Sequence, residues 1–123
     1  MLTERLGGFD LVPEASDDPR ADLATVVERL MTFYAASFPI FSTPGLLTSW
    51  RAGIVERSGG GPQHPLLVVE GIVRNRLPEL DAGAVAALLV GAAFQAAFLA
   101  CFDGLDAVPD SSARARALVA AVT

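Results

Sequence analysis

Few side chains in this chain are of the types that perform catalysis, and their spacing does not let them work together. There is a single histidine, His64, and a single cysteine, Cys101. One histidine cannot form a two-His metal site or an HExxH helix. Cys101 lies in an apolar segment with no activating group beside it, which favours a small buried residue over a nucleophile paired with His64. We therefore expect no enzyme activity, no catalytic residues, no metal and no cofactor.

The carboxylates and the glycine-rich loop also lack the spacing of chemical motifs. Asp17, Asp18 and Asp22 gather at one predicted helix start, where the positive end of the helix dipole accounts for them. The glycines of Ser58–Pro62 follow no predicted strand and precede no Gly-Lys-Ser/Thr, so a flexible loop is favoured over a phosphate-binding loop. His64 stands before Pro65 at another helix start. It is either an exposed or capping residue there or a contact to a ligand.

Composition bounds the class of protein. The chain has 123 residues, which predicts a single domain over residues 1–123. Its formal net charge is −5, and all nine basic residues are arginine. An acidic chain with scattered arginines has no electrostatic footprint for nucleic acid, so we expect no direct nucleic-acid binding by these residues. Hydrophobic residues make up 52% of the chain, which predicts more apolar surface than one small core can bury.

The hydrophobic spacing is helical throughout, and sustained period-two alternation is missing. We predict an all-α fold of five main helices plus a short N-terminal stub. In chain order these are a stub over Met1–Leu6, a helix from Asp18-Pro19 to about Ser37 that Phe38-Pro39 ends, a helix opening at Thr43-Pro44, and helices over about Pro65–Leu77, Ala82–Phe102 and about Ser112–Val122.

The helix over Ala82–Phe102 is apolar on every side, so one small core can cover only part of it. A membrane, a ligand or a second copy of the chain must cover the rest. Asp81 and Asp103 bracket the segment, whereas membrane helices are usually flanked by Lys/Arg and Trp/Tyr. The first ten residues do not resemble a signal peptide. We therefore expect a cytoplasmic protein with no membrane span, in which Asp81 caps this helix and Gly104 ends it.

A stripe of small residues on this helix favours homodimerisation over burial within one subunit. Gly83, Ala87 and Gly91 recur every four residues, and bulky phenylalanines continue the same spacing. Small residues let helices approach closely, and a two-fold dimer makes such a surface self-complementary. The predicted dimer interface consists of Gly83, Ala87, Gly91, Phe94, Phe98, Phe102 and Leu118.

Aromatic residues fall on four neighbouring segments and have two interpretations. They either wall a cavity with a few polar points or simply fill the core. On the first interpretation, the ligand-binding residues are Tyr34, Phe38, Trp50, Ile54, His64, Phe94, Gln95 and Phe98.

The segment LPELDAGAVAALLVGAAFQAAFL, Leu77 to Leu99, resembles the helix that pairs with its symmetry mate in tetracycline repressor-like (TetR-family) transcriptional regulators. DPRADLATVVERLMTFY (Asp18–Tyr34) resembles a helix entry found in the family, and TPGLLTSWRAGIVE and HPLLVVEGIVRNRL resemble the two helices that follow it. The resemblance covers most of residues 19–122.

This resemblance implies an all-α regulatory domain in which the last two helices of each subunit form an intersubunit four-helix bundle. It also implies a small lipophilic effector bound among the earlier helices, and a role in transcriptional repression. The helix-turn-helix domain of the family is missing before Asp18. We therefore expect an excised ligand-binding domain, or a natural headless relative, whose DNA binding would belong to a parent protein. The alternative is a ligand-free helical dimerisation or adaptor module.

Overall fold

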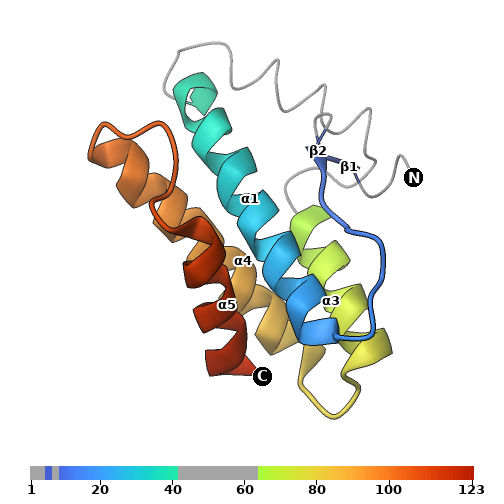
Figure 1. The fold of residues 1–123 in the computed structure, drawn as a ribbon. Coiled ribbons are helices and arrows are strands. Elements are labelled where there is room, and N and C mark those ends of the chain that lie inside the picture. Colours follow the sequence, from blue (N-terminus) through green and yellow to red (C-terminus); the bar gives the residue numbers. More distant parts are fainter. Residues whose placement is uncertain (1–4, 7–8, 42–63) are drawn as a thin grey trace.

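The computed structural model describes residues 5–6, 9–41 and 64–123. Within these ranges its regular secondary structure is helical except for one pair of two-residue strands (Figure 1). The elements are β1 (Arg5–Leu6), β2 (Phe9–Asp10), α1 (Pro19–Phe41), α3 (His64–Arg76), α4 (Ala82–Phe102) and α5 (Ser111–Val122). The all-α prediction is thus confirmed with four helices in the described residues. The helix predicted to open at Thr43-Pro44 lies outside them.

The predicted N-terminal helical stub and the predicted end of the first helix were both wrong. The helical stub does not reach Arg5–Leu6, because these residues pair with β2 as an antiparallel strand in the register Arg5↔Asp10. Two glycines stand between the strands in the sequence, and Gly-Gly favours a two-residue hairpin connection. Helix α1 also continues past Pro39 to Phe41. A proline this close to a helix end removes only one backbone hydrogen bond, and packing of the preceding Phe38 against α4 opposes an earlier stop.

Helix α4 begins and ends where its local signals place it. The side chain of Asp81 accepts a hydrogen bond from the backbone N–H of Ala84 at 3.1 Å, as an N-cap does. At the other end, the N–H of Gly104 donates to the Cys101 carbonyl and the N–H of Leu105 donates to the Ala100 carbonyl. This is a Schellman ending, and Gly104 adopts the left-handed φ of 79° that the motif requires.

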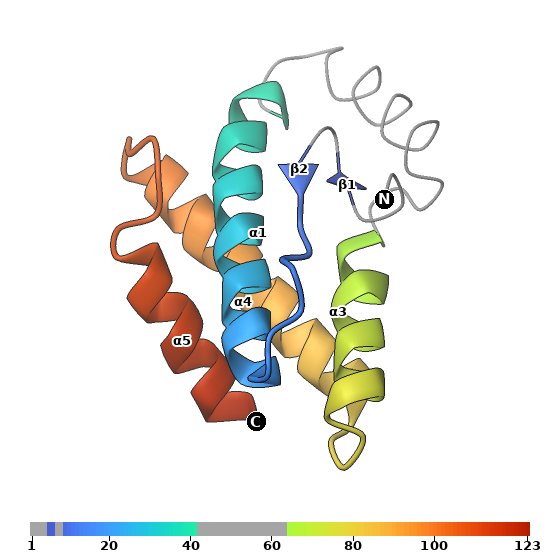
Figure 2. The same ribbon diagram turned by 45° about the vertical axis from the view of Figure 1, so that its right-hand side comes forward.

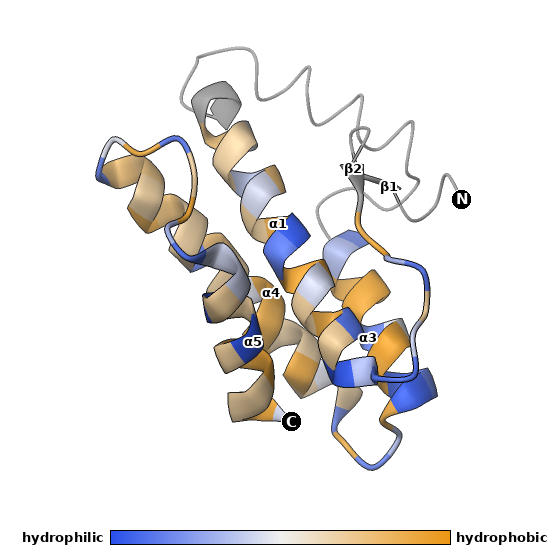
Figure 3. Cartoon of the chain, in the orientation of Figure 1, coloured by the Kyte–Doolittle hydropathy of each residue, from blue (hydrophilic) through white to orange (hydrophobic). Residues whose placement is uncertain are grey.

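The core lies where α1 crosses α4. Helix α1 packs against both α4 and α5, and α3 packs against α4 on the other side (Figures 1 and 2). The fully buried large side chains include Leu23, Leu30 and Met31 of α1, Leu89 of α4, and Val69 and Val73 of α3. Figure 3 shows the α4 ribbon toward the hydrophobic end of the colour scale over most of its length.

A polar cluster joins the start of α1 to the end of α3. Asp22 accepts hydrogen bonds from the backbone N–H and the hydroxyl of Ser16, at 2.9 and 2.8 Å, and it pairs with the guanidinium of Arg76. Arg76 also donates to the carbonyl oxygen of Ser16. The Ser16 backbone N–H, with Arg76, lowers the pKa of Asp22 from 3.8 to about 2. This cluster holds the start of α1 beside the end of α3, the two helices that pack against α4.

Candidate functional site

Helix α4 has one buried side and one exposed side, although almost all of its residues are apolar. The buried side packs on the other three helices through Val85, Ala86, Leu89, Val90, Ala93, Ala97 and Ala100. The exposed side carries large apolar side chains, with Leu88 58% exposed and Phe102 81% exposed. Gln95 is the one polar side chain exposed on this side of α4. We call the remaining exposed residues the α4 apolar face: Gly83, Ala84, Ala87, Leu88, Gly91, Phe94, Phe98, Leu99, Cys101 and Phe102.

Most of the predicted dimer interface lies on this face. Gly83, Ala87 and Gly91 are exposed in the first half of α4, and Phe94, Phe98 and Phe102 are exposed in its second half. Leu118 of α5 is half-buried and packs against the core. The expectation that Cys101 is buried was wrong, because residue 101 falls on this outward side of the helix.

Four of the predicted ligand-binding residues are packed together as rings. Tyr34 of α1 meets Phe94 of α4 edge-to-face with 5.2 Å between ring centroids. Phe38 meets Phe94 at 5.2 Å and Phe98 at 5.9 Å in the same geometry. Such edge-to-face pairs are favourable beyond the burial of their area. This ring cluster (Tyr34, Phe38, Phe94 and Phe98) therefore connects the interior of the helical layer to the α4 apolar face.

Burial shifts the pKa of two titratable residues expected near a ligand, Tyr34 and His64. Burial raises the pKa of Tyr34 from 10.0 to about 12. His64 is only 7% exposed, so the expectation of an exposed helix-start residue was wrong. Burial lowers the pKa of His64 from 6.5, which favours the neutral imidazole. Its buried Nε2 has no hydrogen-bond partner among the described residues. Trp50 and Ile54, the remaining aromatic and aliphatic candidates, lie outside the described part of the chain.

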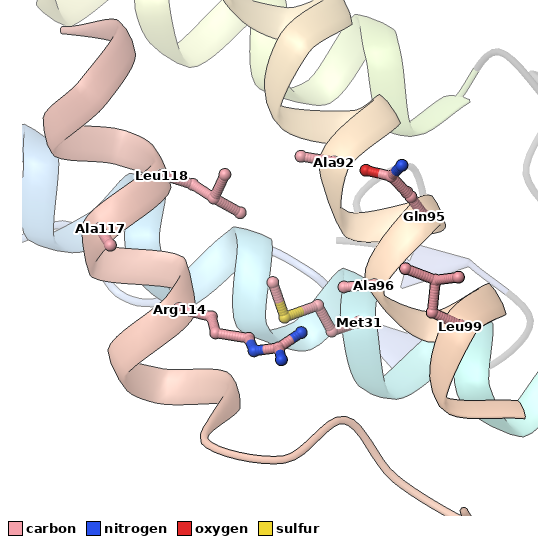
Figure 4. Close-up of a pocket in the computed structure, with 8 residues that line it drawn as sticks. All are labelled: Met31, Ala92, Gln95, Ala96, Leu99, Arg114, Ala117 and Leu118. Carbon is pink, nitrogen blue, oxygen red and sulfur yellow. The ribbon is translucent and has the colours of Figure 1, made fainter. Parts of the chain in front are cut away.

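Gln95 is exposed on the same side of α4 as Phe94 and Phe98 but is rotated away from Phe94. It faces an open groove between α4 and α5 with a volume of about 340 Å³ (Figure 4). From α4 the groove is lined by Ala92, Gln95, Ala96 and Leu99, and from α5 by Arg114, Ala117 and Leu118. Met31 of α1 also lines it. Because successive helix residues are rotated by about 100°, Gln95 and the neighbouring Phe94 cannot point the same way.

The groove was not anticipated from the sequence. The helical spacing of the lining residues is the sequence signal that could have grouped them. Arg114, Ala117 and Leu118 stand at i, i+3 and i+4 and therefore share one side of α5. Gln95 and Leu99 share a side of α4 in the same way. No local pattern tells which sides of the two helices meet, because that depends on how both pack on α1.

Metal binding and membrane insertion are two further possible roles of the described residues. Within them, no group of three or more His, Cys, Asp or Glu side chains is placed to hold a metal ion. One helix in the described ranges, Ala82–Phe102, is long and apolar enough to cross a membrane. Length and composition alone are weak grounds for a span, since core helices of soluble proteins pass the same criteria.

Comparison with known proteins identifies no family or function for this chain. No family model, no curated protein and no solved structure matches the chain.

Proposed function

We propose that this chain is the effector-binding and homodimerisation domain of a transcriptional repressor of the TetR type, acting in the cytoplasm. In this proposal a second copy covers the α4 apolar face, and a small lipophilic effector binds near the ring cluster and His64. DNA binding is the task of a separate helix-turn-helix domain.

The α4 apolar face is the observation that carries the proposal. It is a row of exposed apolar side chains along a helix of 21 residues, or about 30 Å, and Gln95 is the polar residue exposed among them. Monomeric soluble proteins rarely expose a contiguous apolar patch of that extent, and such patches mark interaction sites. The same face combines glycine and alanine near its start with phenylalanine further on. This mixture suits close packing of helices in a two-fold dimer.

Support for an effector comes from His64. A buried polar atom without a hydrogen bond costs free energy, typically about 1–3 kcal/mol, and needs an explanation. An effector that hydrogen-bonds to Nε2 supplies one. Because burial disfavours the imidazolium, a neutral effector with a hydroxyl or amide group fits better than one that needs a charged partner.

A ligand-free dimerisation module is the second candidate, and the ring cluster favours it. The rings of Tyr34, Phe38 and Phe94 pack on one another at centroid distances of 5.2 Å, and thereby fill space that a cavity would need. In that case the aromatic residues belong to the core, and the α4 apolar face alone carries the function.

A thermal-shift screen with three probe classes (fatty acids, steroids and aromatic alcohols) separates the two candidates. A ligand at 100 times its Kd stabilises the folded state by about 2.7 kcal/mol, which raises Tm by about 10 °C in a domain of this size. We expect at least one class to stabilise the protein. Failure of every class would leave the ligand-free module as the better account.

The variant His64→Leu tests the role of Nε2 in any response found. Replacing an unpartnered buried imidazole with an apolar side chain should leave the ligand-free Tm unchanged or higher. The ligand-induced shift should fall by half or more. A full ligand response in His64→Leu would show that the effector does not contact this atom.

A further inference from the structure

The groove between α4 and α5 combines apolar walls with two polar side chains, Gln95 and Arg114. The rest of its lining is alanine, leucine and methionine. In Figure 4, Gln95 and Leu99 extend from α4, while Arg114 reaches from α5 toward Met31 between the two helices. Within the described residues, neither the Gln95 amide nor the Arg114 guanidinium has a hydrogen-bond or ion-pair partner. The groove therefore holds two polar groups that the described fold does not use.

The guanidinium of Arg114 differs from those of four other arginines, which are paired. Arg20, Arg74, Arg76 and Arg116 each donate to an oxygen atom of this chain. No carboxylate lines the groove around Arg114. Arg114 also stands in the first turn of α5, where the positive end of the helix dipole favours an anion and disfavours a cation. Both the side chain and its position favour a bound anion that the described residues do not supply.

We propose that this groove binds a small monocarboxylate with an apolar tail. The carboxylate pairs with Arg114, and the tail lies along the alanine, leucine and methionine side chains. This site is separate from the effector site proposed above, because His64 belongs to α3, which packs on the other side of α4. The inference therefore depends neither on that effector nor on the dimer.

Charge complementarity favours a carboxylate over other molecules with an apolar part. The planar guanidinium of arginine matches a carboxylate through two parallel N–H···O bonds, which are stronger than hydrogen bonds between neutral groups. Gln95 adds an amide N–H donor on the α4 side of the groove. A neutral ligand would leave Arg114 unpaired, and a cation would be repelled by it. The net charge of −5 opposes anions at long range, but salt at about 0.15 M screens exposed charges beyond about 8 Å.

The volume of the groove limits the size of the tail. It is about 340 Å³, near the lower end of the roughly 300–1,000 Å³ that is typical of small-molecule sites. An apolar cavity of about 150 Å³ holds a benzene ring, so the groove admits an apolar group of roughly ten carbons. A medium-chain alkanoate or an arylalkanoate meets this limit, whereas a phospholipid with two long chains does not.

Isothermal titration calorimetry of the wild-type protein with octanoate, near neutral pH, tests the site. We expect a Kd below about 1 mM. Two matched ligands separate the charge from the tail: 1-octanol has the same chain length without a charge, and octylammonium carries the opposite charge. Both should bind at least about tenfold more weakly, because neither pairs with a guanidinium.

Two pairs of substitutions on α5 locate the bound carboxylate and its tail. Arg114→Gln removes the charge from the groove and should raise the octanoate Kd at least about tenfold, whereas Arg116→Gln, outside the groove, should change it less than about twofold. Ala117→Trp fills the groove and should abolish binding. Ala120→Trp is its control, since Ala120 is an exposed alanine of the same helix that does not line the groove. Circular dichroism checks that all four variants keep their helical content.

Three results would overturn the proposal. The first is no heat of binding with octanoate at about 10 mM. The second is equal binding of octanoate by the wild-type protein and Arg114→Gln, or equal binding of octanoate and 1-octanol, since either would mean adsorption to apolar surface without a carboxylate site. The third is loss of binding in His64→Leu but not in Arg114→Gln, which would place the carboxylate at the effector site proposed near His64. Loss of binding in Arg114→Gln but not in His64→Leu supports the groove and leaves the effector proposal to its own test.

Discussion

The two sides of α4 are both largely apolar, but one is buried and the other is exposed. Leu89 is fully buried against the other helices, whereas its neighbour Leu88 is 58% exposed. The buried side consists mostly of alanine, valine and leucine, while the phenylalanines lie on the exposed side. The larger apolar side chains are thus on the side that the described part of the chain does not cover. This difference indicates that the exposed side is adapted to a contact, and we propose that the contact is a second copy.

The largest effect should come from truncating Leu88 and Leu89 one at a time. The two variants compare the exposed and the buried side of α4 directly. Leu89→Ala leaves a cavity in the core and should lower the free energy of unfolding by about 2–5 kcal/mol. Leu88→Ala removes an exposed side chain and should change monomer stability by less than about 0.5 kcal/mol. Urea unfolding of dilute protein measures both.

The effects of these two variants on dimer association should have the opposite order to their effects on monomer stability. Leu88→Ala should weaken the dimer, whereas Leu89→Ala should affect association only through unfolding. Equal losses of monomer stability for the two variants would mean that both leucines are buried in the isolated chain, and the comparison of the two sides would fail.

An intermediate effect, with opposite signs in monomer and dimer, is expected at Gly91. A Cβ at Gly91 meets no described atom within 4 Å, so a methyl group fits the monomer. Gly91→Ala should stabilise the isolated helix by about 0.5–1 kcal/mol through helix propensity. It should also raise the dimer Kd, if another helix approaches closely there.

Gly71→Ala on α3 is the matched control for Gly91→Ala, because a Cβ there also meets no described atom within 4 Å. It should bring the same gain in monomer stability and no change in association. If Gly91→Ala tightened the dimer, close helix approach at Gly91 would be ruled out.

The smallest effect should come from Asp22, whose contacts with Ser16 and Arg76 hold α1 beside α3. The pKa of Asp22 is about 2 in the folded chain and near 3.8 when unfolded, so its carboxylate stabilises the fold above about pH 4. That contribution is lost as the pH falls from about 4 to 2. In Asp22→Asn this component should vanish, which acid titration of Tm for both proteins measures. An unchanged acid profile in Asp22→Asn would show that the contacts with Ser16 and Arg76 contribute nothing.

Local signals explain which parts of the fold could be predicted. The bounds of α4 follow from Asp81 and Gly104, which act within a few residues of themselves. The end of α1 was not predictable in this way, because packing of Phe38 on α4 competes with the stop signal of Pro39. The pairing of Asp22 with Arg76 joins residues 54 positions apart and leaves no local pattern.

In the candidate sites, too, local periodicity predicts some features, whereas others depend on tertiary packing. Periodicity along α4 placed the glycines and phenylalanines of the predicted interface on one side, and the structure exposes them together. Gln95 was grouped with the aromatic rings because it is the polar residue of the run, although helical rotation alone separates it from Phe94. The groove that Gln95 lines depends on how α4 and α5 pack on Met31, which only the tertiary structure reveals.

The most direct measurement of the central claim is the mass of the wild-type protein in solution. Sedimentation equilibrium at about 10 µM should give twice the 12.8 kDa of the chain. The double substitution Phe98→Ser with Phe102→Ser, on the α4 apolar face, should give a folded species of 12.8 kDa. A wild-type protein that remains at 12.8 kDa up to about 100 µM would contradict the account, because the α4 apolar face would then have no second copy to cover it.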